Sequence, residues 1–302
     1  EYKAVMAANE RVMVWMTSQK FYEAIMMSVK QNGKWTDPVN ITPQVGSDGE
    51  MEPTGLSADG KDLLLVVRGQ YDSDIYHSRY DGVLWSKAEP LKGDINSNFT
   101  EDHASFFPGE DSILIASDRR GSIGGLDLYV SRKLQDGTWG EPYNLGALIN
   151  TEQDETSGYI SPDGKYLVFS SKGHFNMGGY DVFQSEISEN GAYIRPFNIG
   201  YPINTTNDNL YFIPLKDGQS GIYSLWDDDG VGNRDIWFYE IIPQETLIAK
   251  ALTRLSEEDF TIKLTDPETG EEILLKYDSV EDKISIQSST GKQYNVVYSR
   301  DE

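Results

Sequence analysis

The chain has 302 residues and a net charge of −23, with 49 acidic residues against 26 basic ones and no cysteine. This acidity argues against nucleic acid or an anionic membrane surface as a partner, because both need a basic surface, and its simplest effect is solubility through repulsion. The absence of cysteine excludes disulfides and cysteine-ligated metals, and no apolar run is long enough to predict a membrane-spanning helix.

One sequence pattern recurs along residues 1–242. Its clearest copy reads Ser-Pro-Asp-Gly-Lys-Tyr-Leu-Val-Phe from Ser161, then a glycine-bearing loop, then Gly-Gly-Tyr-Asp-Val-Phe from Gly178. The aspartate before the last apolar pair recurs with spacings of 53, 54 and 54 residues, at Asp74, Asp127, Asp181 and Asp235. A period this regular indicates a repeat architecture.

Each repeat predicts short strands rather than helices. Its apolar runs are brief and are bounded by Asp-Gly or Pro-Gly turns, which is typical of buried strands joined by hairpins. Four strands in about fifty residues correspond to one propeller blade, since a single such sheet cannot bury its own faces. We therefore expect an all-β, five-bladed β-propeller of four-stranded blades, or a six-bladed one if a whole blade is missing. The expected blades lie near residues 1–50, 51–103, 104–155, 156–208 and 209–242.

The fifth blade is incomplete in sequence. It has three inner strands, near 209–213, 220–225 and 235–242, but lacks the aromatic residue and proline that mark the outer strand elsewhere. A closed propeller must pair or cover that edge. Either residues 246–252 or a segment upstream of residue 1 supplies the strand. We favour the upstream segment, because residues 1–6 already look like an innermost strand, and we expect the chain to begin in mid-protein.

The pattern changes after residue 242. Residues 243–258 read as a linker. Within 259–302, four short runs of alternating character near 260–264, 272–276, 283–286 and 294–298 predict a small antiparallel β domain. A unit of this size is marginally stable by itself.

Acidic and amide side chains precede each expected innermost strand. In a propeller these segments surround one mouth of the central channel, so a negative funnel could face a cation or a basic peptide. The residues predicted to form this partner-binding face are Glu50, Asp102, Asp154, Glu155 and Asp208.

The repeated aspartates Asp74, Asp127, Asp181 and Asp235 invite a catalytic interpretation. Against it, they start the third strand of each blade, away from the channel. A carboxylate there can accept backbone N–H bonds from its own Gly-Gly loop. We expect a structural role for all four.

Other candidates for chemistry are few. The loop before Asp235 is dense in oxygen ligands, and Asp227, Asp229 and Asn233 could bind calcium, although their spacing differs from that of an EF-hand. No other cofactor is predicted. The histidines lie in separate blades without metal-site spacing, at His77, His103 and His174. The basic residues just past the second strands could pair with carboxylates or receive an anion, and we favour ion pairing; they are Arg68, Arg119, Arg120 and Lys172.

The repeat resembles the Pro-Asp β-propeller repeat of TolB-like, WD40-like proteins. The resemblance rests on the copy at 161–183 and on the preceding Ile149-Asn150-Thr151, which returns as Ile203-Asn204-Thr205. It covers 1–242, but the first copy departs from it, with Ala24 in place of the aspartate. The repeat sequence is most similar to that of propellers in large Bacteroidetes envelope proteins, one of which is a type IX secretion component.

In that family the propeller precedes a carboxypeptidase-regulatory-like sandwich, which the stretch 260–273 resembles, and a peptidoglycan-binding OmpA-type domain. The resemblance implies a non-enzymatic protein-binding scaffold in the periplasm or at the outer membrane. It would be part of a larger envelope-anchored protein that reaches peptidoglycan only through domains outside this chain. The alternative is a carbohydrate-active enzyme, a glycosidase or lyase, on a five-bladed propeller. That reading would need non-repeating acids that reach the channel from different blades.

Overall fold

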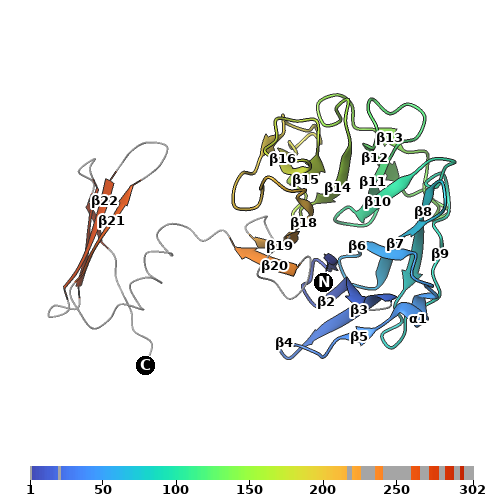
Figure 1. Ribbon diagram of the computed structural model, residues 1–302, viewed down its shortest axis with the longest axis horizontal. Helices are drawn as coiled ribbons and strands as arrows, with labels where there is room; N and C mark the ends of the chain where they lie inside the picture. Colours follow the sequence, from blue (N-terminus) through green and yellow to red (C-terminus); the bar gives the residue numbers. More distant parts are fainter. Residues whose placement is uncertain are drawn as a thin grey trace. The chain divides into compact units, whose positions relative to one another are not determined.

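The structure is a computed structural model that describes residues 2–19, 22–215, 220–225, 235–240, 260–265, 272–278, 283–288 and 293–295. The chain divides into two compact units, residues 1–240 and 241–302. The first is a five-bladed β-propeller, as predicted: five antiparallel sheets stand around a central axis (Figure 1).

Each blade is built from consecutive strands, ordered outward from the axis. The innermost strands are β1 (Tyr2–Met6), β6 (Met51–Leu56), β10 (Glu101–Phe106), β14 (Glu155–Ile160) and β18 (Leu210–Leu215). The second strands are β2 (Val12–Gln19), β7 (Asp62–Arg68), β11 (Ser112–Ser117), β15 (Tyr166–Ser171) and β19 (Ser220–Leu225). The third strands are β3 (Tyr22–Gln31), β8 (Ser73–Arg79), β12 (Asp127–Arg132), β16 (Asp181–Glu186) and β20 (Asp235–Glu240).

The outer strands are short. They are β4 (Lys34–Trp35) and β5 (Val39–Asn40) in blade one, β9 (Glu89–Pro90), β13 (Tyr143–Asn144) and β17 (Phe197–Asn198) in the next three blades. Blade one also carries the only helix of the described residues, the short α1 (Thr42–Val45). Prolines at or beside these strands suit an edge that has no ladder bond to lose on its outer side.

The ring closes by packing of the first blade on the fifth. As predicted, β1 is an innermost strand, and it contacts β18, β19 and β20 of blade five. The described part of blade five is a three-stranded sheet. The candidate for its fourth strand, residues 246–252, lies outside the described residues.

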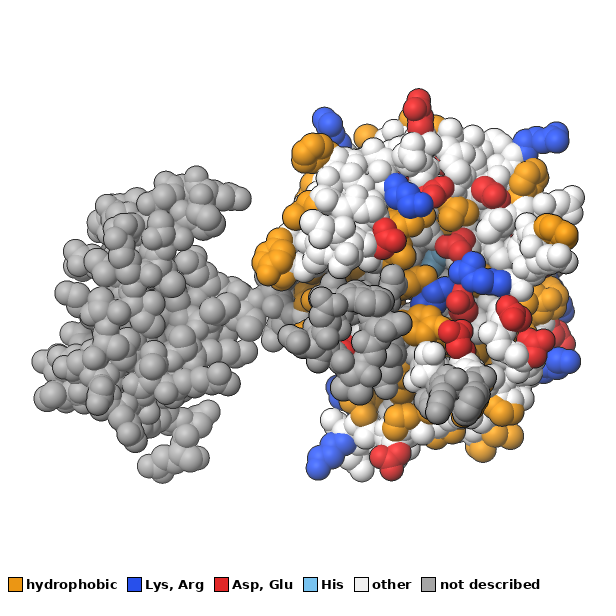
Figure 2. All heavy atoms as spheres, in the orientation of Figure 1, with side chains coloured by type: hydrophobic (Ala, Val, Ile, Leu, Met, Phe, Trp, Pro, Cys, Tyr) orange, Lys and Arg blue, Asp and Glu red, His pale blue; other side chains and the backbone are white. Residues whose placement is uncertain are grey.

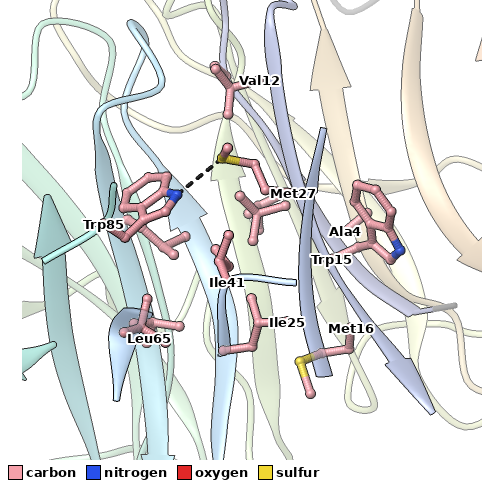
Figure 3. Packing of buried hydrophobic residues seen from close by; sticks show 14 of the residues in the cluster. Ala4, Val12, Trp15, Met16, Ile25, Met27, Ile41, Leu65 and Trp85 are labelled. Atoms are coloured by element: carbon pink, nitrogen blue, oxygen red, sulfur yellow. Dashed lines mark hydrogen bonds between the residues drawn. The ribbon is translucent and has the colours of Figure 1, made fainter. Parts of the chain in front are cut away.

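Apolar side chains fill the spaces between blades. The largest cluster joins blades one and two, where the Trp85 indole N–H lies 3.1 Å from the Met27 sulfur and packs near Ile25 and Ile41 (Figure 3). A second cluster joins blades two and three through Leu64, Ile75, Ile113 and Trp139. Each sheet therefore buries its apolar faces against its neighbours, which is the main stabilisation expected of a propeller.

A repeated asparagine completes each of the three middle blades. The Asn150 side chain accepts the Leu128 N–H at 2.8 Å and donates to the Leu128 carbonyl at 3.0 Å, as an adjacent strand would. The same pair of bonds recurs one blade earlier and one later, with Asn96 on Ile75 and Asn204 on Val182. The Ile-Asn motif seen in the sequence thus supplies hydrogen bonds to the third strand beyond the end of the short outer strand.

The second unit contains one antiparallel sheet of sequential strands, as predicted. Its strands are β21 (Phe260–Thr265), β22 (Glu272–Asp278), β23 (Lys283–Ser288) and β24 (Gln293–Asn295). Across the described residues of both units, no helix is long and apolar enough to cross a membrane.

Candidate functional site

The innermost strands begin at one end of the propeller, and that end carries charge. Acidic and basic side chains mix around the centre of the face shown in Figure 2. We call this region the charged mouth and define it by the second residue of each innermost strand together with Arg68. The six residues are Lys3, Glu52, Asp102, Thr156, Tyr211 and Arg68.

The charged mouth is asymmetric, because the blades contribute different side chains to it. By strand register, Glu52, Asp102 and Thr156 are equivalent positions of blades two, three and four. Lys3 and Tyr211 lie one residue further along the innermost strands of blades one and five. The charged mouth therefore combines two successive strand positions, and its chemistry differs from blade to blade.

These side chains form one connected network. Arg68 bridges two blades: its Nη2 lies 3.0 Å from Glu52 Oε2 and its Nη1 lies 3.2 Å from Asp102 Oδ1. The Lys3 ammonium also pairs with Glu52, and the Thr156 hydroxyl donates to Asp102 Oδ2 at 3.0 Å. Both carboxylates are thus used as acceptors by neighbouring protein groups. Arg68 is the most open ion-paired side chain of the network, with 41% of its surface exposed.

Lys3 and Tyr211 close the network on the side of blade five. The Lys3 ammonium lies 5.1 Å from the centre of the Tyr211 ring. Burial by itself would lower the pKa of Lys3, but Tyr211 and Glu52 outweigh it and hold that pKa above its ordinary value. Burial has the opposite effect on the phenol and raises the pKa of Tyr211. The mouth therefore holds a charged lysine and a neutral phenol side by side at neutral pH.

The backbone at the charged mouth is irregular in every blade. Each innermost strand has a register shift against its second strand near these positions. Three residues there have left-handed backbone, with φ of 48° at Lys3, 51° at Ser157 and 59° at Tyr211. Such angles are costly outside glycine, and bulges of this kind re-aim side chains near functional sites. The direction in which the mouth side chains point therefore depends on these bulges and on the left-handed backbone beside them.

Three buried side chains of the innermost strands form a hydrogen-bonded cluster next to the charged mouth, which we call the plug. The His103 Nε2 lies 2.9 Å from the Gly158 carbonyl, which can only accept, so Nε2 carries the proton. The other nitrogen, Nδ1, then accepts the Thr54 hydroxyl at 2.7 Å. The Tyr159 hydroxyl crosses from blade four to the Thr54 carbonyl at 3.0 Å, and its ring meets His103 edge-on. His103, Thr54 and Tyr159 join three blades at the axis.

Below the plug, the opposite end of the channel is apolar. A pocket of about 270 Å³ opens there and takes residues from all five blades, among them Val5, Leu56, Phe106, Ile160 and Pro214. The two ends of the propeller thus differ in chemistry.

We predict that His103 makes the stability of the propeller depend on pH. Burial lowers its pKa from 6.5 to about 4, so the folded protein keeps the imidazole neutral while the unfolded chain protonates it. The stabilisation is complete above pH 6.5 and is lost as the pH falls toward and through 4. It amounts to about 3 kcal/mol. Urea unfolding at a series of pH values should show that His103→Gln, although less stable at pH 7, loses less between pH 6.5 and 4. Parallel pH profiles for the two proteins would contradict the assignment.

The predicted acidic face is divided between different roles. Glu50 is exposed and Asp102 belongs to the charged mouth. Glu155 is fully buried, and its carboxylate accepts bonds from the Thr151 backbone N–H and hydroxyl, both at 2.7 Å, and from the Ser171 hydroxyl at 2.6 Å. Burial raises the pKa of Glu155 despite these bonds. Glu155 therefore faces inward and is not presented to a partner.

Asp154 and Asp208 link neighbouring blades. Asp154 Oδ1 accepts the Leu126 N–H of the preceding blade at 3.1 Å, and Asp208 Oδ1 accepts the Tyr180 N–H at 3.0 Å. A Cβ on the second glycine of either Gly-Gly loop would come within 2.1 Å of these oxygens. The Gly-Gly pair of the repeat thus permits the close approach of one blade's loop to the next blade's aspartate.

Three of the four predicted basic residues form the expected ion pairs with carboxylates near the mouth. Besides Arg68, the Lys172 ammonium lies 2.8 Å from Asp154 Oδ2, and Arg119 Nη2 lies 3.0 Å from the buried Glu101. Burial opposes the effect, but Lys172 and the Leu126 N–H lower the pKa of Asp154. Arg120 forms no ion pair with the residues described here. The mouth is therefore mixed in charge rather than a uniformly negative funnel.

The repeated aspartates lie at the start of the third strands, and two of them have the predicted bonds. Asp181 is fully buried and accepts N–H groups from Met177 at 2.5 Å and Gly178 at 3.3 Å. Asp127 does the same with Ile123 and Gly124. Asp74 follows a loop without a Gly-Gly pair, and its carboxylate accepts no hydrogen bond within the described chain. The loop before Asp235 lies outside the described residues.

No predicted metal ligand can be placed. Asp227, Asp229 and Asn233, the candidate calcium ligands, lie outside the described residues. Among the residues that are described, no group of three His, Asp or Glu side chains could hold a metal ion. His103 belongs to the plug, His77 contacts Asp62, and His174 Nε2 lies 2.9 Å from the Ile149 carbonyl.

Sequence reasoning missed most of the charged mouth. Of its six residues only Asp102 and Arg68 were singled out. The repeat carries no signal for the other four, because they fall at two successive positions of the innermost strand and neither position keeps one side chain.

No family model matches the chain, and no curated protein matches it. Among solved structures, it is similar to TolB from Acinetobacter baumannii, with a TM-score of 0.51 and 14% identity over 96% of this chain and 54% of that one. It is also similar to an α-L-arabinofuranosidase from Lactobacillus brevis, with a TM-score of 0.50 and 12% identity over 79% of this chain and 90% of that one. The chain spans about half the length of this TolB. Identities this low show a shared propeller fold and no more.

Proposed function

We propose that this chain is a non-catalytic interaction module that binds a partner protein at its charged mouth. One observation carries the proposal: all five blades contribute a charged or polar side chain, Lys3, Glu52, Asp102, Thr156 and Tyr211, to one network at the same end of the propeller. Because these side chains differ from blade to blade, the network presents an asymmetric surface that a partner could recognise. The carboxylates of the network are held by Arg68 and Lys3, an arrangement that suits recognition better than acid–base chemistry.

The preferred partner is a polypeptide of mixed charge. Arg68 and Lys172 offer partly exposed cations, while Asp102 and Asp154 offer partly exposed carboxylates. Opposite charges placed around the charged mouth favour correct orientation of a partner more than they favour raw affinity. The resemblance to TolB-like propellers supports a site in the periplasm, within a larger envelope protein that is outer-membrane-associated through its other domains.

The proposal is tested by capture from envelope extracts with three forms of the protein. Arg68→Gln removes the bridging cation of the charged mouth, whereas Lys165→Gln removes an exposed cation paired with Asp163 in a turn at the other end of blade four. We expect one partner to be captured by the wild type and by Lys165→Gln but not by Arg68→Gln. Equal capture by all three would place the binding elsewhere.

A carbohydrate-active enzyme is the second candidate, and one observation favours it. Glu52 and Asp102 come from different blades and meet at the axis around Arg68, and glycosidases use two carboxylates. The test is release of reducing sugar from arabinan and other polysaccharides by the purified chain. Turnover that disappears in both Glu52→Gln and Asp102→Asn would establish the enzyme and overturn the binding module.

A further inference from the structure

A second candidate site lies far from the charged mouth, in the cleft between the outer parts of blades two and three. The cleft has a volume of about 650 Å³, which is within the range of small-molecule sites. Its lining includes Asp62 and Arg79 from blade two and Lys133 and Trp139 from blade three. We call it the blade 2–3 cleft.

One wall of the blade 2–3 cleft is a fixed cluster of three polar side chains. The Asp62 carboxylate receives Arg79 Nη1 at 2.8 and 2.9 Å and lies 2.7 Å from His77 Nε2. Burial opposes the effect, but His77 and Arg79 together lower the pKa of Asp62. Asp62 thus holds both neighbours in place and leaves the second imidazole nitrogen of His77 without a partner among the described residues.

This cluster is absent from the equivalent positions of the neighbouring blades. By strand register, blade one places Val12, Met27 and Val29 there, and blade three places Ser112, Val130 and Arg132. Across the clefts, Lys133 of blade three corresponds to Tyr80 and Ile187. The fold therefore does not require the Asp62, His77 and Arg79 set, which is not repeated in blades one and three.

Three ammonium groups of the blade 2–3 cleft are uncommitted. Lys87, Lys92 and Lys133 are exposed, and none forms an ion pair with the described residues. Lys133 lies 5.3 Å from the centre of the Trp139 ring, which holds it at the cleft. Three lysines without an ion pair in the described chain, lining one cleft of a protein with a net charge of −23, would attract an anionic group.

The same cleft also offers acceptors and apolar surface. Glu89 is exposed, and Glu110 lines the cleft while its Oε1 accepts the Ala58 N–H at 3.0 Å. Phe106 and Leu91 are half-buried and add apolar atoms. A simple anion would be repelled by these carboxylates. A ligand with an acid group, hydroxyl donors and a carbon ring would contact the lysines, the carboxylates and the apolar side chains of the cleft at once.

We propose that the blade 2–3 cleft binds an acidic sugar, with its carboxylate or phosphate on Lys87 and Lys133 and its hydroxyl groups on Glu89. This site goes beyond the function proposed for the charged mouth and does not depend on it. The acid group can come from a uronic acid or from a sugar phosphate, since lysine binds both as a point charge.

The test is titration calorimetry at low ionic strength, where exposed charges are least screened. The probes are glucuronate, glucose 6-phosphate, glucose and inorganic phosphate. We expect at least one acidic sugar to bind, glucose not to bind, and inorganic phosphate to bind at least about tenfold more weakly than the sugar. The stronger of the two acidic sugars identifies the acid group.

Variants then locate the binding. Lys87→Gln combined with Lys133→Gln should weaken it at least about tenfold. The melting temperature should fall by at most about 4 °C, because neither lysine forms an ion pair with a described residue and only the exposed contact of Lys133 with the Trp139 ring is lost. Arg132→Gln, in the equivalent cleft between blades three and four, should leave it unchanged. The proposal is overturned by an absence of binding of both acidic sugars, by equal binding of glucose or inorganic phosphate, or by equal binding to the double variant.

Discussion

Replacing Asp181 with alanine should lower the melting temperature of the propeller by roughly 8 °C. The substitution leaves the Met177 and Gly178 N–H groups without their acceptor and removes the partner of the Asn198 amide, 2.8 Å away. A loss of this kind costs about 3 kcal/mol, and each kcal/mol corresponds to about 2–4 °C in a domain of this size. Thermal unfolding followed by circular dichroism provides the measurement.

Asp74 is the matched control for Asp181, since strand register places it at the same point of its blade. Burial, followed by the charges of Glu101 and Asp72, raises the pKa of Asp74, so its ionised carboxylate is disfavoured in the fold. Asp74→Ala should therefore be neutral or slightly stabilising. Equal losses in the two variants, or an unchanged Asp181→Ala protein, would refute the assigned role of the carboxylate.

Gly93→Ala should be at least as damaging, by about 3 kcal/mol or more. Gly93 has φ of 107°, and a Cβ on it would lie 2.1 Å from the Trp139 carbonyl oxygen and 2.5 Å from the Trp139 nitrogen. Both contacts are backbone, so no side chain can move aside. The clash would separate the strand edge at which Trp139 donates to the Lys92 carbonyl at 3.1 Å. Urea unfolding should report the loss as a lower midpoint.

Gly137 is the control for Gly93. It too has left-handed backbone, with φ of 83°, but a Cβ there would meet nothing within 4 Å. Gly137→Ala should therefore cost only the backbone term, about 1 kcal/mol. If the two variants lost the same stability, backbone angle rather than the approach of blade three would explain the effect at Gly93.

The propeller was predictable because the same sequence pattern occurs in several blades. A turn, an apolar run and an aspartate recur at fixed spacing, and each copy confirms the others. Blade one was placed correctly even though Ala24 replaces the aspartate, since Val14 and Ile25 keep the apolar strands in phase. The motif Ile149-Asn150 was identified only as part of the resemblance to TolB-like repeats. The structure explains it, because the Asn150 side chain makes two hydrogen bonds to the Leu128 backbone.

The charged mouth was not predictable by the same route. Repetition is the signal that finds structural residues, and it is silent on residues that differ in each copy. The bulges that aim Lys3 and Tyr211 depend on left-handed backbone at non-glycine residues, which propensities disfavour. Similarly, Glu155 and Asp102 look alike in sequence, although one is buried in its own turn and the other faces the axis.

The plug formed by His103, Thr54 and Tyr159 has a consequence for how the molecule works as a component. Its hydrogen bonds join blade two to blades three and four, so the loss of the imidazole would weaken two blade junctions together. The charged mouth and the apolar pocket are built on the same innermost strands, and both would be affected by that loss.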